Sequence, residues 1–393
     1  MSAIPPIQLP VLDARPPPTS LSRRSADAIA LAQHAERRDP PHPAQPKGKP
    51  CPSTDPPGSG GRAATFGLTV LLTAGTAAPA ALATPAPTAA LATTATHPGH
   101  AAGTRLGDVR VLAHFDRAAG QAAESIALEP GGGAIIGMIP GRQVVRVAQD
   151  GAVQVLVTMP LPPGGGGTTP VIGDPVVTGV ARSDSGAVYF LYSSGQGGLT
   201  GIWQVRRSGE PRLVVPLPAD TMPNALVIDG KRDRFLVTDS AGGRIWQAPL
   251  RGGEASVWSA DPVLAPGAFF GANGMKIHDG AVWASNSDHG TIVRIPLTKS
   301  GGSGRAEVRA TGLEGIDDFD FTGQGTEILA AINQSSKLVR VDADGTHETL
   351  LDAQDGMQGT TAVAIQGNRA YVTNGANLVG NDSNLLLAKL QRR

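Results

Sequence analysis

Cysteine is almost absent from this chain, with Cys51 as the single example. An internal disulfide and a thiolate metal site are therefore excluded. Net charge of either sign is also absent, because 33 Lys and Arg residues balance 33 Asp and Glu residues. No basic field points to nucleic acid or to an anionic membrane surface. Phosphate-binding loops, dinucleotide fingerprints and the Gly-x-Ser-x-Gly elbow of serine hydrolases are missing too, so neither nucleotide chemistry nor a serine triad is expected.

The first hundred residues lack the periodicity of a folded domain. Residues 1–61 are rich in Pro, Arg, Ser and Asp, and we interpret them as a disordered extension. Residues 62–83 begin with a basic residue, continue through an apolar stretch and end in a small-x-small sequence at Ala83, as signal peptides do; a second such sequence ends at Ala92. A membrane anchor is the alternative, although the strongly apolar part is short for a span. Residues 84–104 are expected to be a flexible linker.

A repeat pattern occupies the remainder, residues 105–393. Six short apolar runs each open with a small oxygen-bearing side chain, and the gaps between these openers are 54, 46, 49, 44 and 44 residues. A second run, rich in β-branched and aromatic residues, follows each of them after a turn signal such as Asp279-Gly280. A period of this length is too long for a helical hairpin and fits a four-stranded sheet. The six openers are Glu124, Thr178, Asn224, Asn273, Asp317 and Thr361.

This pattern predicts an all-β fold, a six-bladed β-propeller with four-stranded antiparallel blades around a central axis. Residues 105–116 are expected to add a strand to the last blade and close the ring. The Gly-rich stretch 160–173 is expected to be a mobile loop inserted in the second repeat. In a radial arrangement the six openers would converge on the axis, where four of them could hold a cation.

Three motifs resemble the gluconolactonase/regucalcin-like family, in its secreted bacterial branch. They are Val237-Thr-Asp-Ser-Ala-Gly-Gly-Arg-Ile-Trp, Gly271-Ala-Asn-Gly-Met-Lys-Ile-His-Asp-Gly and Gly315-Ile-Asp-Asp-Phe-Asp-Phe. The resemblance extends over about residues 109–390 and is strongest between residues 224 and 321. It implies a six-bladed propeller with one divalent cation on its axis, and hydrolysis of a lactone.

Carried over position by position, the resemblance assigns the cation ligands to Glu124, Asn224, Asn273 and Asp317. It makes Asp317 the general base, with Asp318 as the alternative. Two carboxylates and two amides form an oxygen-only site, for which Ca²⁺ is the expected ion in a secreted protein. Mg²⁺, Mn²⁺ and Zn²⁺ also remain open. Thr178 and Thr361 are then spacers beside the ligand set.

The chain also departs from that family. Met222 and Pro223 stand where the family carries a substrate-binding Arg. The substrate is therefore expected to be a lactone or a sugar-derived small molecule without further definition. A non-catalytic propeller that binds a small molecule or a protein, with a structural cation, is the main alternative, and a strictosidine-synthase-like condensing enzyme is another. Each opener could also simply bond its own backbone, as Asn and Asp at strand starts often do.

We expect the chain to be exported and cleaved near Ala83 or Ala92, which leaves no membrane span in the mature protein. N-terminal analysis of the chain recovered from the culture medium tests this expectation. A full-length chain in the cytosolic fraction would contradict it.

Overall fold

The fold is known from a computed structural model that describes residues 103–164, 167–206 and 209–392. The predicted extension (1–61), the signal-peptide-like segment (62–83) and most of the predicted linker (84–104) lie outside the described residues. Among the residues that are described, no helix is long and apolar enough to cross a membrane.

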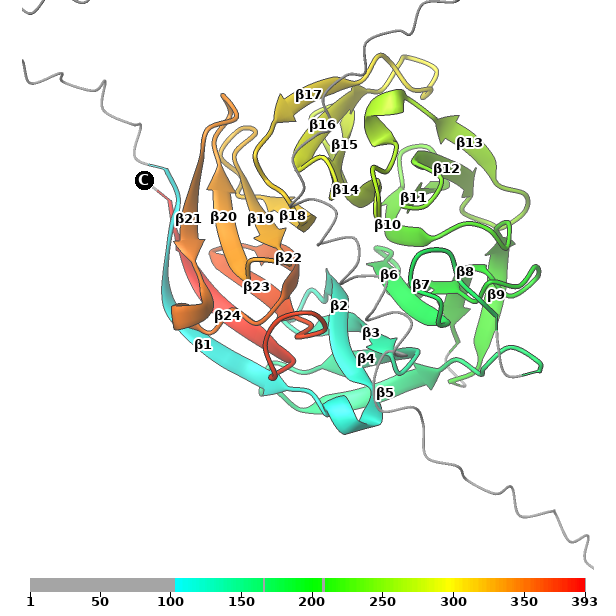
Figure 1. Cartoon of the computed structure of the whole chain (residues 1–393), viewed down its shortest axis with the longest axis horizontal. Coiled ribbons are helices and arrows are strands. Elements are labelled where there is room, and N and C mark those ends of the chain that lie inside the picture. Colours follow the sequence, from blue (N-terminus) through cyan, green and yellow to red (C-terminus); the bar gives the residue numbers. More distant parts are fainter. Residues whose placement is uncertain (1–102, 165–166, 207–208, 393) are drawn as a thin grey trace, which may run out of the picture. The chain divides into compact units, whose positions relative to one another are not determined.

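Six four-stranded antiparallel sheets form the described part of the chain, and they are arranged as the blades of a propeller (Figure 1). This confirms the predicted fold class. Blade 1 contains β2 (Gln121–Leu128), β3 (Ala134–Pro140), β4 (Gln143–Val147) and β5 (Val153–Thr158). Blade 2 contains β6 (Val176–Arg182), β7 (Val188–Ser193), β8 (Gly201–Val205) and β9 (Pro211–Pro216). Blade 3 contains β10 (Pro223–Asp229), β11 (Arg234–Asp239), β12 (Arg244–Pro249) and β13 (Ser256–Ser259).

The second half repeats the same plan. Blade 4 contains β14 (Ala272–His278), β15 (Ala281–Asn286), β16 (Thr291–Pro296) and β17 (Glu307–Ala310). Blade 5 contains β18 (Ile316–Phe321), β19 (Ile328–Ile332), β20 (Lys337–Val341) and β21 (His347–Leu351). Blade 6 contains β22 (Thr360–Gln366), β23 (Arg369–Asn374), β24 (Asn384–Gln391) and, from the start of the described chain, β1 (Arg105–His114). Three short 3-10 helices lie in the connections: η1 (Arg117–Ala119), η2 (Pro262–Leu264) and η3 (Ala353–Asp355).

In a short loop, the residue types of the turn follow directly from its backbone conformation. Asp279 and Gly280 join β14 to β15, and both have positive φ, 45° and 68°. A two-residue hairpin with two positive φ values requires residues such as Asp and Gly, which tolerate that conformation. The sequence signal at this hairpin therefore has a direct structural cause.

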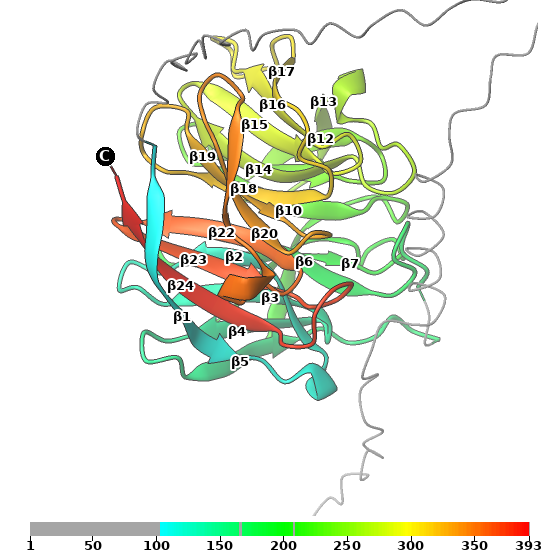
Figure 2. The same ribbon diagram turned by 60° about the vertical axis from the view of Figure 1, so that its left-hand side comes forward.

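Strand β1 closes the ring, as expected. It pairs antiparallel with β24, so the outermost strand of the last blade comes from the beginning of the propeller (Figure 2). The inserted stretch in the second repeat connects β5 to β6, and its described residues carry one isolated bridge, between Thr169 and Gly173. The structure contains no named strand in the described part of this insertion.

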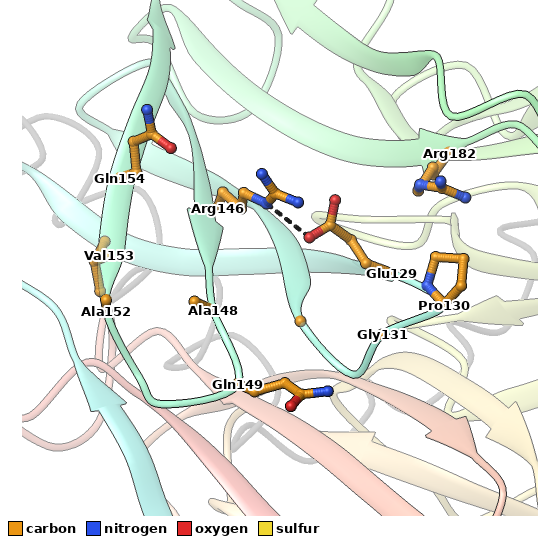
Figure 3. Close-up of a pocket in the computed structure, with 11 residues that line it drawn as sticks. Glu129, Pro130, Gly131, Arg146, Ala148, Gln149, Ala152, Val153, Gln154 and Arg182 are labelled. Atoms are coloured by element: carbon orange, nitrogen blue, oxygen red, sulfur yellow. Dashed lines mark hydrogen bonds and ion pairs between the residues drawn. The ribbon is translucent and has the colours of Figure 1, made fainter.

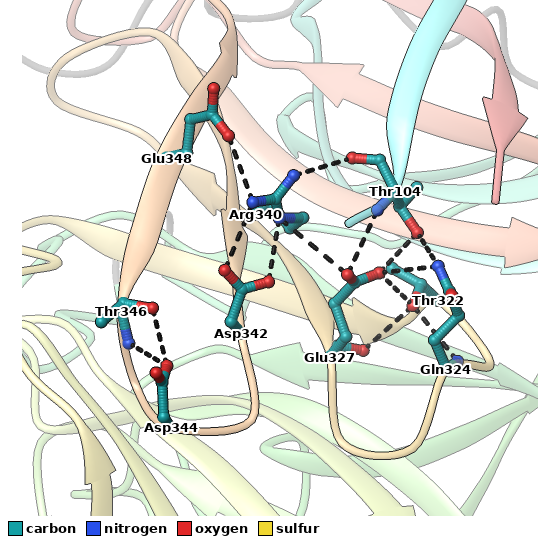
Figure 4. A network of polar contacts seen from close by, with 9 residues as sticks. All are labelled: Thr104, Thr322, Gln324, Glu327, Arg340, Asp342, Asp344, Thr346 and Glu348. Atoms are coloured by element: carbon teal, nitrogen blue, oxygen red, sulfur yellow. Dashed lines mark hydrogen bonds and ion pairs between the residues drawn. The ribbon is translucent and has the colours of Figure 1, made fainter. Parts of the chain in front are cut away.

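A buried polar network fixes the start of the closing strand to blade 5 (Figure 4). The backbone N–H of Thr104 donates to Glu327 at 3.2 Å, and its carbonyl oxygen accepts from Arg340 at 3.2 Å. Arg340 also contacts Asp342 at 2.9 Å and Glu348 at 3.1 Å. The side chains of Arg340 and Glu327 are only 6% and 9% exposed. The network therefore connects the first described residues to a blade that they do not join by strand pairing.

The hydrophobic core lies between the blades. Each of six large apolar clusters combines residues from two neighbouring blades, so no single blade buries its own faces. Trp283 of blade 4, for example, packs with Phe319 of blade 5. Because the apolar side chains pack between the sheets, the residues around the axis come from the innermost strands and need not be apolar.

All six openers occupy the same structural position. In each innermost strand the pairing register shifts at the opener, so the opener is a bulge residue rather than a paired one. The backbones come close here: a Cβ on Gly179 would lie 2.4 Å from the carbonyl oxygen of Asn224, and one on Gly274 would lie 2.7 Å from that of Asp317. The regular spacing in sequence thus reflects one recurring bulge at the axis.

Replacing Arg340 with Ala should destabilise the propeller by about 3 kcal/mol, because Glu327 and Thr104 would lose a buried charged partner. Urea denaturation measures the change. Arg294→Ala is the matched control, since Arg294 lies at the corresponding place on β16 opposite Trp283, as Arg340 lies opposite Leu329. Its partner Glu307 is 48% exposed, so the control should cost at most about 1 kcal/mol. Equal losses in the two variants would contradict the role of the network.

Candidate functional site

Three of the four predicted ligands line one cavity. Glu124, Asn273 and Asp317 come from blades 1, 4 and 5, and they face the same cavity. Glu124 and Asp317 are half-buried. The structure therefore brings together side chains separated by up to 193 residues of sequence (317 − 124).

The fourth predicted ligand, Asn224, is not among the residues that line the cavity. It is buried, at 6% exposure, and its amide donates to the Ser240 hydroxyl at 3.2 Å. Asn224 nevertheless occupies the same position in blade 3 that Asn273 occupies in blade 4. The residue before each of them pairs with the last residue of the second strand: Pro223 pairs with Asp239, and Ala272 pairs with Asn286. Asn224 thus occupies the predicted bulge, one blade away from the three residues that share the cavity.

In three consecutive blades, the opener is hydrogen-bonded to the side chain of the residue that follows the second strand of the same blade. Asn273 donates its amide to Ser287 at 2.8 Å, which repeats the Asn224–Ser240 contact of the preceding blade. In blade 5 the equivalent residue is Asn333, whose amide donates to the Asp317 carboxylate at 3.2 Å. The amide nitrogens of Asn224 and Asn273 are engaged in this way, so their oxygens are the groups left for a ligand.

Asn333 is a site residue that sequence reasoning missed. It lines the cavity, and its amide oxygen is buried without a hydrogen-bond partner. Its recurrence could have revealed it, since the residue following the end of the second strand is Ser240, Ser287 or Asn333 in three consecutive blades. An unpaired buried oxygen is costly, and here it lies beside a carboxylate.

Burial and mutual repulsion disfavour ionisation of the two carboxyl groups. Burial raises the pKa of Glu124 from 4.5 to about 7, and the negative charge of Asp318 adds to the rise. Burial also raises the pKa of Asp317 well above its ordinary value, with further contributions from Glu124 and Asp318. Hydrogen bonds from Asn333 and Asn273 act in the opposite direction. The two carboxyl groups therefore ionise readily only when a positive charge enters the site.

Asp318, the alternative general base, is already paired. Both of its carboxylate oxygens accept from the Lys276 ammonium at 2.7 Å. It does not line the cavity that contains Asp317. Asp317, in contrast, lines the cavity and has no cationic partner among the described residues, so it remains the candidate base.

The two threonine openers have a structural role. Thr178 donates its hydroxyl to the Pro223 carbonyl of the next blade at 2.7 Å, and Thr361 donates to the Ala123 carbonyl at 3.0 Å. They occupy the same bulge position as the ligand candidates, but their hydroxyl groups form hydrogen bonds to the neighbouring blade.

These residues fit a divalent cation. Two carboxylates, an amide oxygen from Asn273 and the unpaired oxygen of Asn333 form a hard donor set that suits Ca²⁺ or Mg²⁺. None of the described residues that line the cavity is Lys, Arg or His. Among the residues that the structure describes, no three or more His, Cys, Asp or Glu side chains form a metal cluster, so a cation here would depend on the amides.

A second, larger hollow lies away from the axis. It has a volume of about 430 Å³ and is lined by residues of blade 1 and by Arg182 of blade 2 (Figure 3). Glu129 and Arg146 form its central ion pair at 2.7 Å, with the Arg side chain 51% exposed. No opener lines it, and an exposed pair of this kind contributes little energy.

Comparison with solved structures shows the fold. A gluconolactonase from Xanthomonas campestris is 17% identical with a TM-score of 0.54, covering 73% of this chain and 91% of its own. The calcium-binding protein regucalcin from Agrobacterium tumefaciens is 17% identical with a TM-score of 0.50, covering 69% and 92%. A PQQ-bound aldose sugar dehydrogenase from Streptomyces coelicolor is 15% identical with a TM-score of 0.53, covering 74% and 99%.

Gluconolactonase and regucalcin propellers are thus among the structural neighbours, as the sequence resemblance anticipated. No protein-family model and no curated protein matches the chain by sequence. At these identities the likeness establishes the propeller, and the dehydrogenase shows that one architecture supports unrelated reactions. Function has to be argued from the cavity itself.

Metal-free protein should lose stability as the pH rises through the range in which Glu124 ionises. A carboxyl group with a higher pKa in the folded state binds its proton more tightly there, so its stabilising effect is present below pH 4.5 and is lost toward about pH 7. Relative to Glu124→Gln, the wild-type chain treated with chelator should lose on the order of 3 kcal/mol between these values. Urea denaturation at several pH values measures this difference.

Glu314→Gln is the control for that experiment, because Glu314 is exposed outside the cavity. Its stability should follow the wild-type curve. If the Glu124→Gln curve also ran parallel to the wild-type curve, the unfavourable burial of the Glu124 charge would be refuted.

Proposed function

We propose that this chain is a secreted, metal-dependent hydrolase of a lactone or a related ester. The observation that carries the proposal is that Glu124 and Asp317, two half-buried carboxyl groups from innermost strands, line one cavity with amide side chains and with no cationic side chain among the described lining residues. Such a cavity favours a cation, and an open cation site favours carbonyl chemistry. Export is proposed from the signal-peptide-like segment 62–83.

The proposed ligands are Glu124, Asn273 and Asp317, which line the cavity; Asn224, the fourth member of the predicted set, does not line it. Ca²⁺ is the proposed ion, because the donors are all oxygen. When bound, the cation supplies a Lewis acid for the carbonyl oxygen of the substrate. The name of the regucalcin neighbour, a calcium-binding protein, agrees with this choice of ion.

Asp317 acts as the general base in this proposal. It accepts a proton from the water that attacks the carbonyl carbon, and it returns the proton to the alkoxide oxygen when the acyl C–O bond breaks. Asn333 orients the Asp317 carboxylate through the 3.2 Å hydrogen bond. Burial raises the pKa of Asp317, so the carboxylate holds an abstracted proton more readily than an exposed Asp would.

A binding protein with a structural cation is the second candidate. The replacement of the family's substrate-binding Arg by Met222 and Pro223 favours it. Saturable binding of lactones without turnover would support this alternative over hydrolysis.

Replacing Asp317 with Asn should lower kcat/KM for lactone hydrolysis by about 10²–10⁴-fold, because the base is removed while size is kept. Chelation should abolish the wild-type activity, and added Ca²⁺ should restore it. Hydrolysis is followed by pH-stat titration of the acid released, with metal content determined on the same samples.

Asp184→Asn serves as the control, because Asp184 lies in the exposed turn between β6 and β7. It should retain wild-type activity. Activity that survives both chelation and Asp317→Asn would rule out the proposed mechanism.

A further inference from the structure

The cavity has a polar floor and an apolar wall. Glu124, Asn273 and Asp317 form the floor. The apolar wall consists of Ile139, Ile172, Phe269, Phe270 and Leu378. These five residues come from strand β3, the β5–β6 insertion, the connection before β14 and the connection before β24. A ligand in the cavity is therefore in contact with hydrophobic side chains from several blades.

The wall belongs to the folded core and is not a set of isolated surface residues. Ile139 and Ile172 are 6% and 9% exposed, and they pack in one cluster with Met222 and Phe270. Met222 and Pro223 stand where the resembled family carries a substrate-binding Arg. An apolar cluster thus replaces that charge on this side of the cavity.

A backbone clamp holds the aromatic part of the wall. The Asp288 carboxylate accepts from the N–H groups of Gly267 and Phe269, at 2.8 and 2.7 Å. The rings of Phe269 and Phe270 contact each other, with centroids 4.2 Å apart. The clamp fixes both rings at the cavity, where they present hydrophobic surface to a ligand.

Ser287, Asp288, Gln334 and Asn377 are the polar residues that line the cavity beside the ligand candidates and Asn333, and the first two are engaged already. Asp288 is committed to the clamp, and Ser287 donates to the Ile316 carbonyl at 2.6 Å while accepting from Asn273. A polyhydroxylated ring packed against the five apolar side chains would have hydroxyl groups without partners on that side, which costs affinity. An anionic ligand would meet carboxylates and no cationic side chain among the described lining residues.

We infer that the substrate is an uncharged ester or lactone with an alkyl or aryl substituent, and that Phe270 and Ile172 determine this specificity. The carbonyl group faces Asp317, and the substituent packs against the apolar wall. The inference rests on the proposed hydrolase function and narrows its substrate class: it favours apolar lactones over sugar lactones.

Three δ-lactones with the same ring test this inference on the full chain with Ca²⁺. We expect kcat/KM for δ-octalactone to exceed that for unsubstituted δ-valerolactone, and that for glucono-δ-lactone, by about tenfold or more, because methylene groups gain about this much in a hydrophobic pocket. Phe270→Ser should abolish most of the preference, and Phe270→Leu should retain it. Val308→Ser is the control, because Val308 is 47% exposed on the outer strand β17, and it should leave the preference unchanged.

Binding of a ketone that cannot be hydrolysed separates this inference from the proposed activity. By calorimetry, 2-propylcyclohexanone should bind about tenfold more tightly than cyclohexanone, and Phe270→Ser should remove the difference while thermal unfolding verifies that the variant is folded. Binding without turnover of any lactone would overturn the hydrolase and leave the apolar specificity standing. Hydrolysis of glucono-δ-lactone at least as fast as δ-octalactone, or equal binding of the two ketones, would overturn the apolar specificity.

Discussion

Hydrogen bonds between neighbouring blades, made at the bulges of the innermost strands, hold the axis of this propeller together. At five of the six junctions a hydroxyl donates to a backbone carbonyl of the next blade, as Ser125 does to Thr178 and Ser285 to Asp317, both at 2.6 Å. At the sixth, the Asp320 carboxylate accepts from the Ile365 N–H at 2.8 Å. Because the bulge leaves backbone carbonyls unpaired within the sheet, these bonds satisfy them. Without them the openers would not converge.

The location of the hydrophobic core explains why the axis can be polar. Apolar side chains are buried between blades, so the stability of the ring does not depend on filling its centre with them. The centre can then hold Glu124 and Asp317 in spite of their unfavourable ionisation. The core between the blades stabilises the fold, and the axis retains groups that are worth keeping only for binding or chemistry.

One structural position serves two purposes in this chain. At the opener bulge, Thr178 and Thr361 join blades, whereas Glu124, Asn273 and Asp317 face the cavity. The residue that follows the second strand differs together with the opener: Ser287 accepts a hydrogen bond from the Asn273 amide, whereas Asn333 donates one to the Asp317 carboxylate. Repetition of the backbone thus allows the side chains to specialise, and the insertion between β5 and β6 adds an apolar wall through Ile172.

The sequence by itself determined the blade count, the closing strand and the equivalence of the six openers, because strand period, turn residues such as Asp279-Gly280 and repeat spacing are local properties. It also identified Glu124, Asn273 and Asp317 as one group. Only the tertiary structure decided that Asn224 lies outside their cavity, that Lys276 already pairs with Asp318, and that Asn333 and Phe270 belong to the site. These facts depend on how neighbouring blades are oriented and how their connections fold back over the axis. The repeat spacing does not specify this long-range packing, although the recurrence of Ser240, Ser287 and Asn333 after the second strands was a partial signal for Asn333.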